Sequence, residues 1–401
     1  MTIGRILLAA LVFAAALGGA LAWREATYGA GPRPSSAAPA GPTREIAVVA
    51  NAVGGTVSLV DVERGAVLRE LNVISDGQRV SVFRDPIQFL AQPIVEGRGG
   101  LNYAQDTDLS RDGTVLFVSR GFLADVVALD IATGAILWRT PVAGVRADHM
   151  TISPDGETLY VSAVIRGGDL VEAIRTRDGK KGGSFQAGRW PHDVHVSADG
   201  RSVWVASLGD MQLDLAARGA EPDAYTVKVF DAATYEPLAT HVFDRGVRPF
   251  QMTADGRMLY AQLSNTHLVL ARDLETGAER RLELPVADGV TADDWDFEAP
   301  HHGLALSPDE QTLCIAGRAS DYAGIVDAAN LSLVETVPVG NAPSWAVFLE
   351  DGRRCVLANT RSDDVSIVDT DERRETARIA VGRGPKHVTA GRVSETVLDA
   401  N

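Results

Sequence analysis

The sequence has little cysteine, few aromatic residues and a deficit of positive charge. Only two of its 401 residues are Cys, and Cys314 and Cys355 show neither a C-x-x-C motif nor zinc-ribbon spacing, so a disulfide-stapled miniprotein is excluded. The 38 Lys and Arg residues face 53 Asp and Glu residues, a formal net charge of -15. Because such an acidic chain lacks a surface for tracking phosphates, we expect no nucleic-acid partner. The length allows one large domain or two ordinary ones.

The N-terminus carries an uncharged apolar run. It follows Arg5, spans residues 6–22 and ends in an A-x-A cleavage pattern at Ala20 to Ala22. We therefore interpret residues 1–22 as a signal peptide or an uncleaved N-terminal anchor, which leaves the rest extracytoplasmic, either secreted or tethered to the membrane. Residues 23–44 are rich in Pro, Ala, Gly and Ser, so we expect a flexible tether there.

A repeat follows the tether. Turn signals of the Ser-Pro-Asp-Gly type recur with a period of about 43 residues and two insertions. Each turn precedes a short β-branched run and then an alternating apolar strand closed in most repeats by Asp, which predicts a four-stranded antiparallel meander. The Asp residues of the recurring turns are Asp112, Asp155, Asp199, Asp255, Asp309 and Asp351.

The number of repeats predicts a closed ring. Residues 45–72 supply three strands, six complete repeats follow, and one further strand lies around Val388. We therefore predict an all-β fold over residues 45–396: a seven-bladed β-propeller of four-stranded blades, with the N- and C-terminal strands closing the ring as three plus one. Since pairing the two chain ends leaves no long edge exposed, we expect a monomer.

Several short motifs resemble the YVTN-type β-propeller repeat family. They are LYVSA at Leu159, VLANT at Val356, the SPDG turns, and G-x-x-P openings at Gly188, Gly340 and Gly382. The resemblance covers nearly everything after the tether and implies the propeller fold. Propellers of this type include lactonase-like enzymes, metal- and haem-site oxidoreductases and binding scaffolds, so the resemblance implies no single function.

One mouth of the predicted ring concentrates the candidate functional residues. The insertions at residues 73–104, 209–224 and 286–300 all fall in loops of that mouth, and the innermost strand of each blade begins there. Five of the eight His residues stand four to six places before a turn, where they should line a central funnel. Imidazoles and carboxylates together are typical of Cu, Zn or Fe sites. The candidate metal ligands are His149, His192, His302, His387, Asp106, Asp148 and Asp193.

Other side chains at this mouth are candidates for contacts with a ligand. The segment from Thr291 carries four carboxylates around two aromatic rings, which fits a solvated acidic lid or a rim that captures a cationic or aromatic ligand. Arginines near the mouth offer anion contacts, with Arg98, Arg120, Arg146 and Arg318 as candidates. The candidate residues of a ligand-binding rim are Arg248, His301, Trp295 and Trp345.

These patterns leave three interpretations of the funnel open: a transition-metal site, a polar ligand site without metal, and repeat residues that only bond backbone at strand starts. The first predicts redox or Lewis-acid chemistry on a small molecule. The alternative function is a non-catalytic envelope-associated binding or scaffold propeller with a protein or carbohydrate partner. A Ser-His-Asp hydrolase has no support, since no G-x-S-x-G elbow is present.

The two cysteines fall on the second strands of adjacent predicted blades. Sheets pack face to face at roughly 10 Å, beyond the ~7 Å limit between Cα atoms for a disulfide, so we predict that Cys314 and Cys355 are buried free thiols.

Overall fold

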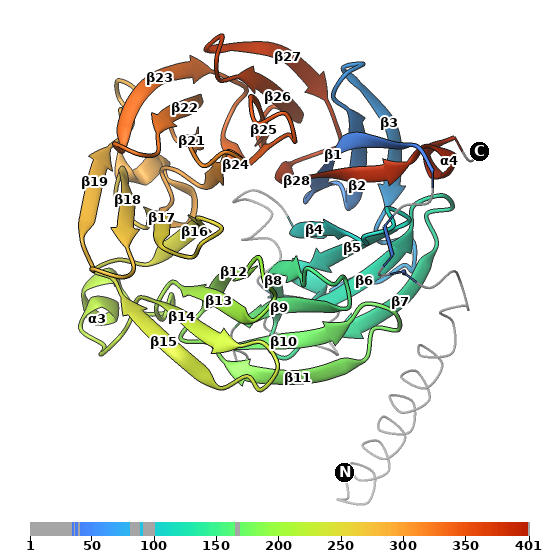
Figure 1. Cartoon of the computed structure of the whole chain (residues 1–401), viewed down its shortest axis with the longest axis horizontal. Helices are drawn as coiled ribbons and strands as arrows, with labels where there is room; N and C mark the ends of the chain where they lie inside the picture. Colours follow the sequence, from blue (N-terminus) through green and yellow to red (C-terminus); the bar gives the residue numbers. More distant parts are fainter. Residues whose placement is uncertain are drawn as a thin grey trace, which may run out of the picture.

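Seven antiparallel sheets surround a central axis in the computed structural model, which describes residues 34–35, 37–38, 41–80, 89–90, 101–164 and 169–399 (Figure 1). Each sheet has four strands, which confirms the predicted seven-bladed β-propeller. The predicted signal or anchor of residues 1–22 lies outside the described residues. Within the described ranges, no helix is long and apolar enough to cross a bilayer.

The strands occupy four concentric positions, and the blades are numbered 1 to 7 around the ring, starting with the blade that contains Thr43. From blade 1 to blade 7, the innermost strands are β28 (Pro385–Ser394), β4 (Asp106–Leu109), β8 (Arg146–Ile152), β12 (Pro191–Val196), β16 (Val247–Met252), β20 (Gly303–Leu306) and β24 (Pro343–Phe348). The second strands are β1 (Thr43–Asn51), β5 (Val115–Arg120), β9 (Thr158–Val164), β13 (Ser202–Ser207), β17 (Met258–Leu263), β21 (Thr312–Gly317) and β25 (Arg354–Asn359). The third strands are β2 (Thr56–Asp61), β6 (Asp125–Asp130), β10 (Leu170–Arg175), β14 (Thr226–Asp231), β18 (Leu268–Asp273), β22 (Tyr322–Asp327) and β26 (Asp364–Asp369). The outermost strands are β3 (Ala66–Asn72), β7 (Ile136–Pro141), β11 (Lys181–Gln186), β15 (Pro237–Val242), β19 (Glu279–Glu283), β23 (Ser332–Pro338) and β27 (Arg374–Ala380). Within the described ranges, the short helices with complete bounds are η1 (Gly121–Leu123), α3 (Leu215–Gly219), η2 (Ala292–Asp294), η3 (Asp296–Glu298) and α4 (Glu395–Leu398).

The recurring Ser-x-Asp-Gly segments form the turns between first and second strands. In blade 3 the Ser153 hydroxyl donates to Asp155 at 2.5 Å and accepts the backbone N–H of Thr158 at 3.0 Å. Gly156 closes this turn with φ at +76°, a left-handed conformation that suits glycine. The Asp carboxylate thus bonds locally at the turn, which is why the repeat shows so clearly in the sequence.

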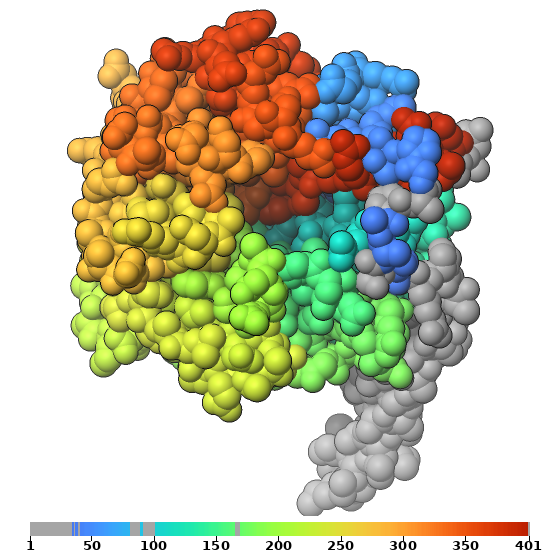
Figure 2. Space-filling model, viewed as in Figure 1, coloured from blue at the N-terminus to red at the C-terminus, as the bar shows by residue number. Residues whose placement is uncertain are grey.

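Blade 1 is built from both ends of the described chain. Its innermost strand β28 pairs antiparallel with β1, from Thr43 opposite Ser394 to Ala50 opposite His387. The segments of lowest and highest number therefore lie side by side, blue against red in Figure 2. Arg44 also bridges the two ends, since its guanidinium contacts Asp61 at 2.9 Å and Glu395 at 3.3 Å. Residues 43–44, assigned to the tether from the sequence, belong to β1.

The two cysteines form a disulfide, so the prediction of free thiols was wrong. Cys314 of β21 and Cys355 of β25 have Cα atoms 6.5 Å apart, inside the bridging limit. Blades converge toward the axis, and small residues line this interface: a Cβ on Gly303 would stand only 2.7 Å from the backbone of Trp345. The spacing of roughly 10 Å describes stacked sheets with larger side chains between them and does not apply here.

Two of the three insertions meet at one mouth of the ring. Arg218 of α3, in the insertion at residues 209–224, forms a two-pronged ion pair with Glu298 of η3, with distances of 2.8 and 3.0 Å. The start of the first insertion is held to blade 2 by Arg120, which is fully buried and bonds both Asp76 and Asp125. These contacts fix residues near Asp76 to blade 2 and join the other two insertions to each other.

Candidate metal centre

Irregularities in the innermost strands bring consecutive side chains to the axis. In β8, Ala147 pairs with Ala163 and Met150 with Val161, so Asp148 and His149 share the place opposite one residue of β9. The same kind of register shift occurs in β12, β16, β24 and β28. A β-bulge re-aims side chains locally. Several blades therefore contribute to the funnel with two adjacent residues where a regular strand would offer one.

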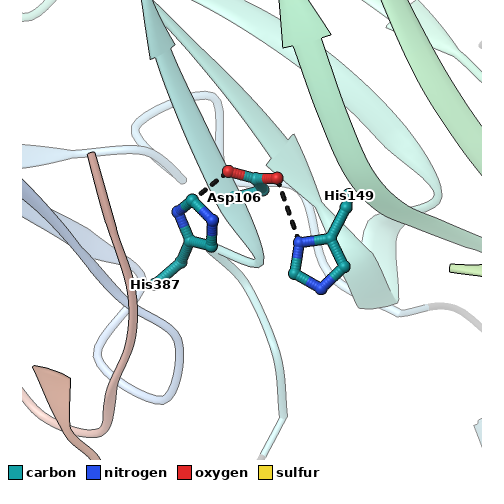
Figure 3. A group of neighbouring side chains, drawn as sticks. All are labelled: Asp106, His149 and His387. Atoms are coloured by element: carbon teal, nitrogen blue, oxygen red, sulfur yellow. Dashed lines mark hydrogen bonds and ion pairs between the residues drawn. The ribbon is translucent and has the colours of Figure 1, made fainter. Parts of the chain in front are cut away.

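Three side chains from consecutive blades meet at the centre of the funnel (Figure 3). His387 of blade 1 and His149 of blade 3 flank Asp106 of blade 2. The Nδ1 atom of His149 lies 3.1 Å from one carboxylate oxygen, and Nδ1 of His387 lies 2.9 Å from the other. All three residues are buried, and their ligand atoms lie within 4.8 Å of one another. This arrangement of two imidazoles and one carboxylate could bind a metal ion.

The surroundings of Asp106 keep it charged. Burial by itself raises the pKa of this carboxyl, but His387 and His149 beside it outweigh that effect and lower the pKa below its ordinary value. The backbone N–H groups of Thr107 and Met150 also donate to it, at 2.6 and 3.0 Å. A carboxylate with four such partners is fixed in place, and it in turn orients both imidazoles.

One neighbour determines the tautomer of His149. The side-chain oxygen of Gln105 accepts from Arg146 at 2.9 Å and from Asn102, so its amide nitrogen is the donor that stands 3.3 Å from Nε2 of His149. Nε2 therefore carries a lone pair, and the proton resides on Nδ1, toward Asp106. Burial lowers the pKa of His149, but its bond to Asp106 and the charge of Asp148 outweigh that effect and raise the pKa above its ordinary value.

Two further imidazoles stand next to this trio. The ring centres of His149 and His192 are 4.6 Å apart, and those of His192 and His302 are 5.5 Å apart. Two rings bound to one tetrahedral metal through nitrogens at about 2.0–2.1 Å would have centres roughly 5 Å apart, so the observed spacing suits shared ligation. Nδ1 of His302 is 3.0 Å from the carbonyl oxygen of Ser344, and Nδ1 of His192 is buried without a hydrogen-bond partner among the described residues.

Both of these rings are neutral at neutral pH. Burial lowers the pKa of His192 well below its ordinary value, and nearby His149 and Arg248 lower it further. Burial likewise lowers the pKa of His302, with His192 and Arg248 contributing. A neutral imidazole with an unused nitrogen is the form that binds a transition metal.

The remaining carboxylates of the predicted site have other partners. Asp193 accepts the backbone N–H of Phe250 and a bond from His195, both at 3.0 Å. It therefore ties blade 4 to blade 5. Asp148 forms an ion pair with Arg146 at 3.2 Å.

The four predicted rim residues lie in three different places. Trp345 is buried in the funnel, where its ring stacks on His149 with centres 4.6 Å apart, because the bulge in β24 turns it inward. His301 lies in a separate cluster, with Nε2 2.9 Å from the Tyr322 hydroxyl and its ring edge-on to His267, which in turn contacts Trp295. Arg248 is buried at the funnel mouth.

Lys386 also lies in the funnel, at a position that the repeat spacing predicts, although it was not among the candidate site residues. It is the extra residue of the bulge in β28, between Pro385 and His387. The signal was its place after Pro385, which matches the place of His192 after Pro191. The acidic segment after Thr291 is also less negative than its sequence suggests, since Arg318 and Arg361 neutralise Asp296.

Comparisons with known proteins support the fold. No family model matches the chain, and no curated protein matches it. Among solved structures, the chain is similar to hydrazine synthase of Kuenenia stuttgartiensis, with a TM-score of 0.62 and 20% sequence identity. The match covers 86% of this chain and 98% of that chain. At this identity the likeness shows the propeller fold alone.

Proposed function

We propose that the funnel binds a transition-metal ion, Cu, Zn or Fe, and that the protein uses it for redox or Lewis-acid chemistry on a small molecule. One observation carries the proposal: His149, His387 and Asp106 converge from three consecutive blades, buried and with their ligand atoms within 4.8 Å. Two histidines and one carboxylate that leave coordination positions open are a recurrent catalytic metal set. When bound, the ion would polarise a substrate oxygen or exchange electrons.

The chain's own residues would shape the open side of this centre. His192 and His302 stand beside the trio with neutral rings, so they complete the ligand set or accept a proton from a bound molecule. Trp345 packs against both His149 and His387, with ring centres 4.6 and 4.2 Å away, and restricts their rotation. This rigid support favours a single ligand geometry.

A second candidate is a non-catalytic envelope-associated binding or scaffold propeller. It is favoured by the contacts of Asp106, whose two oxygens already have two backbone donors and two imidazoles as partners. In this case the Asp106 carboxylate would have a structural role, because its bonds join blade 2 to blades 1 and 3.

We further propose that the chain is a YVTN-type repeat propeller that is exported from the cytoplasm and acts as a monomer. The disulfide between Cys314 and Cys355 supports export, because structural disulfides persist mainly in oxidising compartments. The repeat motifs of the sequence support the family, and pairing of β28 with β1 supports a self-contained ring.

Metal analysis of the purified full chain tests the metal proposal. We expect close to one equivalent of Cu, Zn or Fe per chain, measured by mass spectrometry after dialysis against the metal. The double variant His149→Ala/His387→Ala should lose at least tenfold in affinity, because it removes two of three ligands. X-ray absorption at the metal edge should report nitrogen and oxygen neighbours.

His241→Ala is the matched control. His241 lies in the outermost strand β15, away from the funnel, and its ring stacks on Trp204 of β13. It should bind metal like the unaltered protein. Substoichiometric metal in the unaltered protein, or equal affinity of the double variant and the control, would refute the metal site and favour the scaffold.

A further inference from the structure

Four basic side chains from four different blades gather around the mouth of the funnel. Arg146 and Lys386 come from the innermost strands of blades 3 and 1, Arg248 from that of blade 5, and Arg318 from the end of the second strand of blade 6. Their proximity is visible in their shared partners: Arg318 donates to the Ser344 hydroxyl at 2.6 Å, and the backbone carbonyl of the same Ser344 bonds His302. Arg318 therefore stands directly beside His302, and the charges of Arg146, Arg248 and Arg318 all act on Lys386.

Two of these cations have no counter-ion among the described residues. Arg146 pairs with Asp148, and Arg318 pairs with Asp296 at 2.8 Å. Within the described ranges, neither Arg248 nor Lys386 has a carboxylate oxygen within 4.0 Å. Arg248 is only 3% exposed, and its guanidinium donates to the Ser264 hydroxyl at 2.9 Å and to the carbonyl of Phe297. Its hydrogen-bond partners are therefore neutral, and the carboxylates whose charge acts on it, Glu298 and Asp148, form no ion pair with it.

A buried charge without an ion pair is costly, and the cost is visible at Arg248. Burial lowers the pKa of Arg248 to about 10, although Glu298 and Asp148 act against that effect. The net charge of the protein is -15, yet these cations lie together at the funnel mouth. Buried charges of this kind are normally paired, so the arrangement is complementary to an incoming anion.

Phe297 covers the same place from the insertion at residues 286–300. Its ring centre lies 5.8 Å from the ammonium of Lys386, and its carbonyl accepts from Arg248. Its φ of 52° is in the left-handed region, which is unfavourable for a bulky residue and is held by the ion pairs of Asp296 and Glu298 on either side. Phe297 as a whole is 54% exposed, so it can contact the apolar part of a bound molecule.

We propose that Arg248 and Lys386 form an anion-binding site at the funnel mouth, which holds the oxyanion group, a carboxylate or phosphate, of a small molecule beside the imidazole cluster. That this molecule is the substrate of the metal centre rests on the proposed function. The anion site itself does not, since neither cation is a ligand of the metal. Arginine and lysine suit this role because both donate charge-assisted hydrogen bonds to oxyanions.

Binding of simple anions to the metal-free full chain tests the site. After removal of metal by chelation and dialysis, we expect saturable binding of benzoate or inorganic phosphate by calorimetry at low ionic strength. Benzamide, the neutral counterpart of benzoate, should not bind. The variant Arg248→Gln/Lys386→Gln should lose about tenfold or more in affinity, as expected for charge-assisted bonds. Tighter binding of benzoate than of phosphate would indicate that the ring of Phe297 contributes to ligand binding. Tighter binding of phosphate would indicate that the site takes a free inorganic oxyanion.

Arg257→Gln is the matched control, because Arg257 lies in the turn between β16 and β17, in the same blade as Arg248 but at the other mouth. It should bind the anion within twofold of the unaltered protein. Lys386→Gln alone serves as the second variant if the double variant does not fold. Absence of saturable binding of both anions, or equal affinity of the charge variants and the control, would overturn the anion site. If the protein binds the anion but takes up no metal, the anion site is supported and only the proposal that its ligand is the substrate of a metal centre is refuted.

Discussion

The disulfide between blades 6 and 7 allows a quantitative test of the tertiary arrangement. Cys314 and Cys355 are separated by 41 residues and are fully buried. Closing a loop of that length removes about 13 cal/mol/K of entropy from the unfolded chain, or about 4 kcal/mol at 25 °C. Unfolding of residues 43–398 carries roughly 2.1 cal/mol/K per residue, so the loss of the bond should lower Tm by about 5 °C.

A double-mutant cycle isolates this contribution. We expect Cys314→Ala, Cys355→Ala and the double variant to melt at the same temperature within about 1 °C, because either single change already abolishes the cross-link. Thermal unfolding followed by circular dichroism gives the three values. Non-reducing peptide mapping of the unaltered protein should find the two cysteine peptides joined.

Two outcomes would refute this reasoning. If the effects of the single variants added up in the double variant, each cysteine would act through its own packing and not through a shared bond. If mapping found two free thiols in the unaltered protein, blades 6 and 7 would be farther apart than the 6.5 Å between Cα atoms indicates.

Two further predictions concern positions where the fold supports the funnel. Arg120→Met should lower the free energy of unfolding by about 1.5–3 kcal/mol, measured in urea, because the fully buried Asp125 loses its two-pronged partner and keeps only Arg139; a change below about 0.5 kcal/mol would contradict this. Gly303→Ala should cost about 1–3 kcal/mol and weaken metal binding, because the new Cβ would meet the backbone of Trp345 at 2.7 Å. Gly182→Ala, whose Cβ would meet nothing closer than 3.7 Å, is its control and should be neutral or slightly stabilising; equal destabilisation by both would show that contact with Trp345 is not the cause.

Much of the fold was predictable because its signals are local. The Ser-x-Asp-Gly turns bond within themselves, as Ser153 and Asp155 show, so each leaves a mark in a few consecutive residues. The blade number followed from the spacing of those turns. The funnel positions followed as well: Asp106 and His149 each lie four places before the Ser of a turn, and His387 lies at the start of the closing strand.

The arrangement within the funnel was not predictable, because it depends on bulges and on the approach of neighbouring blades. Nothing in the residues around Trp345 signals that a register shift turns this ring onto His149. Likewise, nothing in the residues around Asp193 signals that its carboxylate accepts the backbone N–H of Phe250, 57 residues away in sequence.

The sequence by itself determined the number of blades, the mouth that carries the insertions and the residues that reach the axis. The reason is that turns and strand alternation depend on residues that are close together in the sequence. Only the tertiary structure decided which of these side chains meet, that the two cysteines are joined, and that Arg248 and Lys386 lack a carboxylate partner among the described residues. The physical reason is that ion pairing, burial and inter-blade distance depend on residues a whole blade or more apart in the chain.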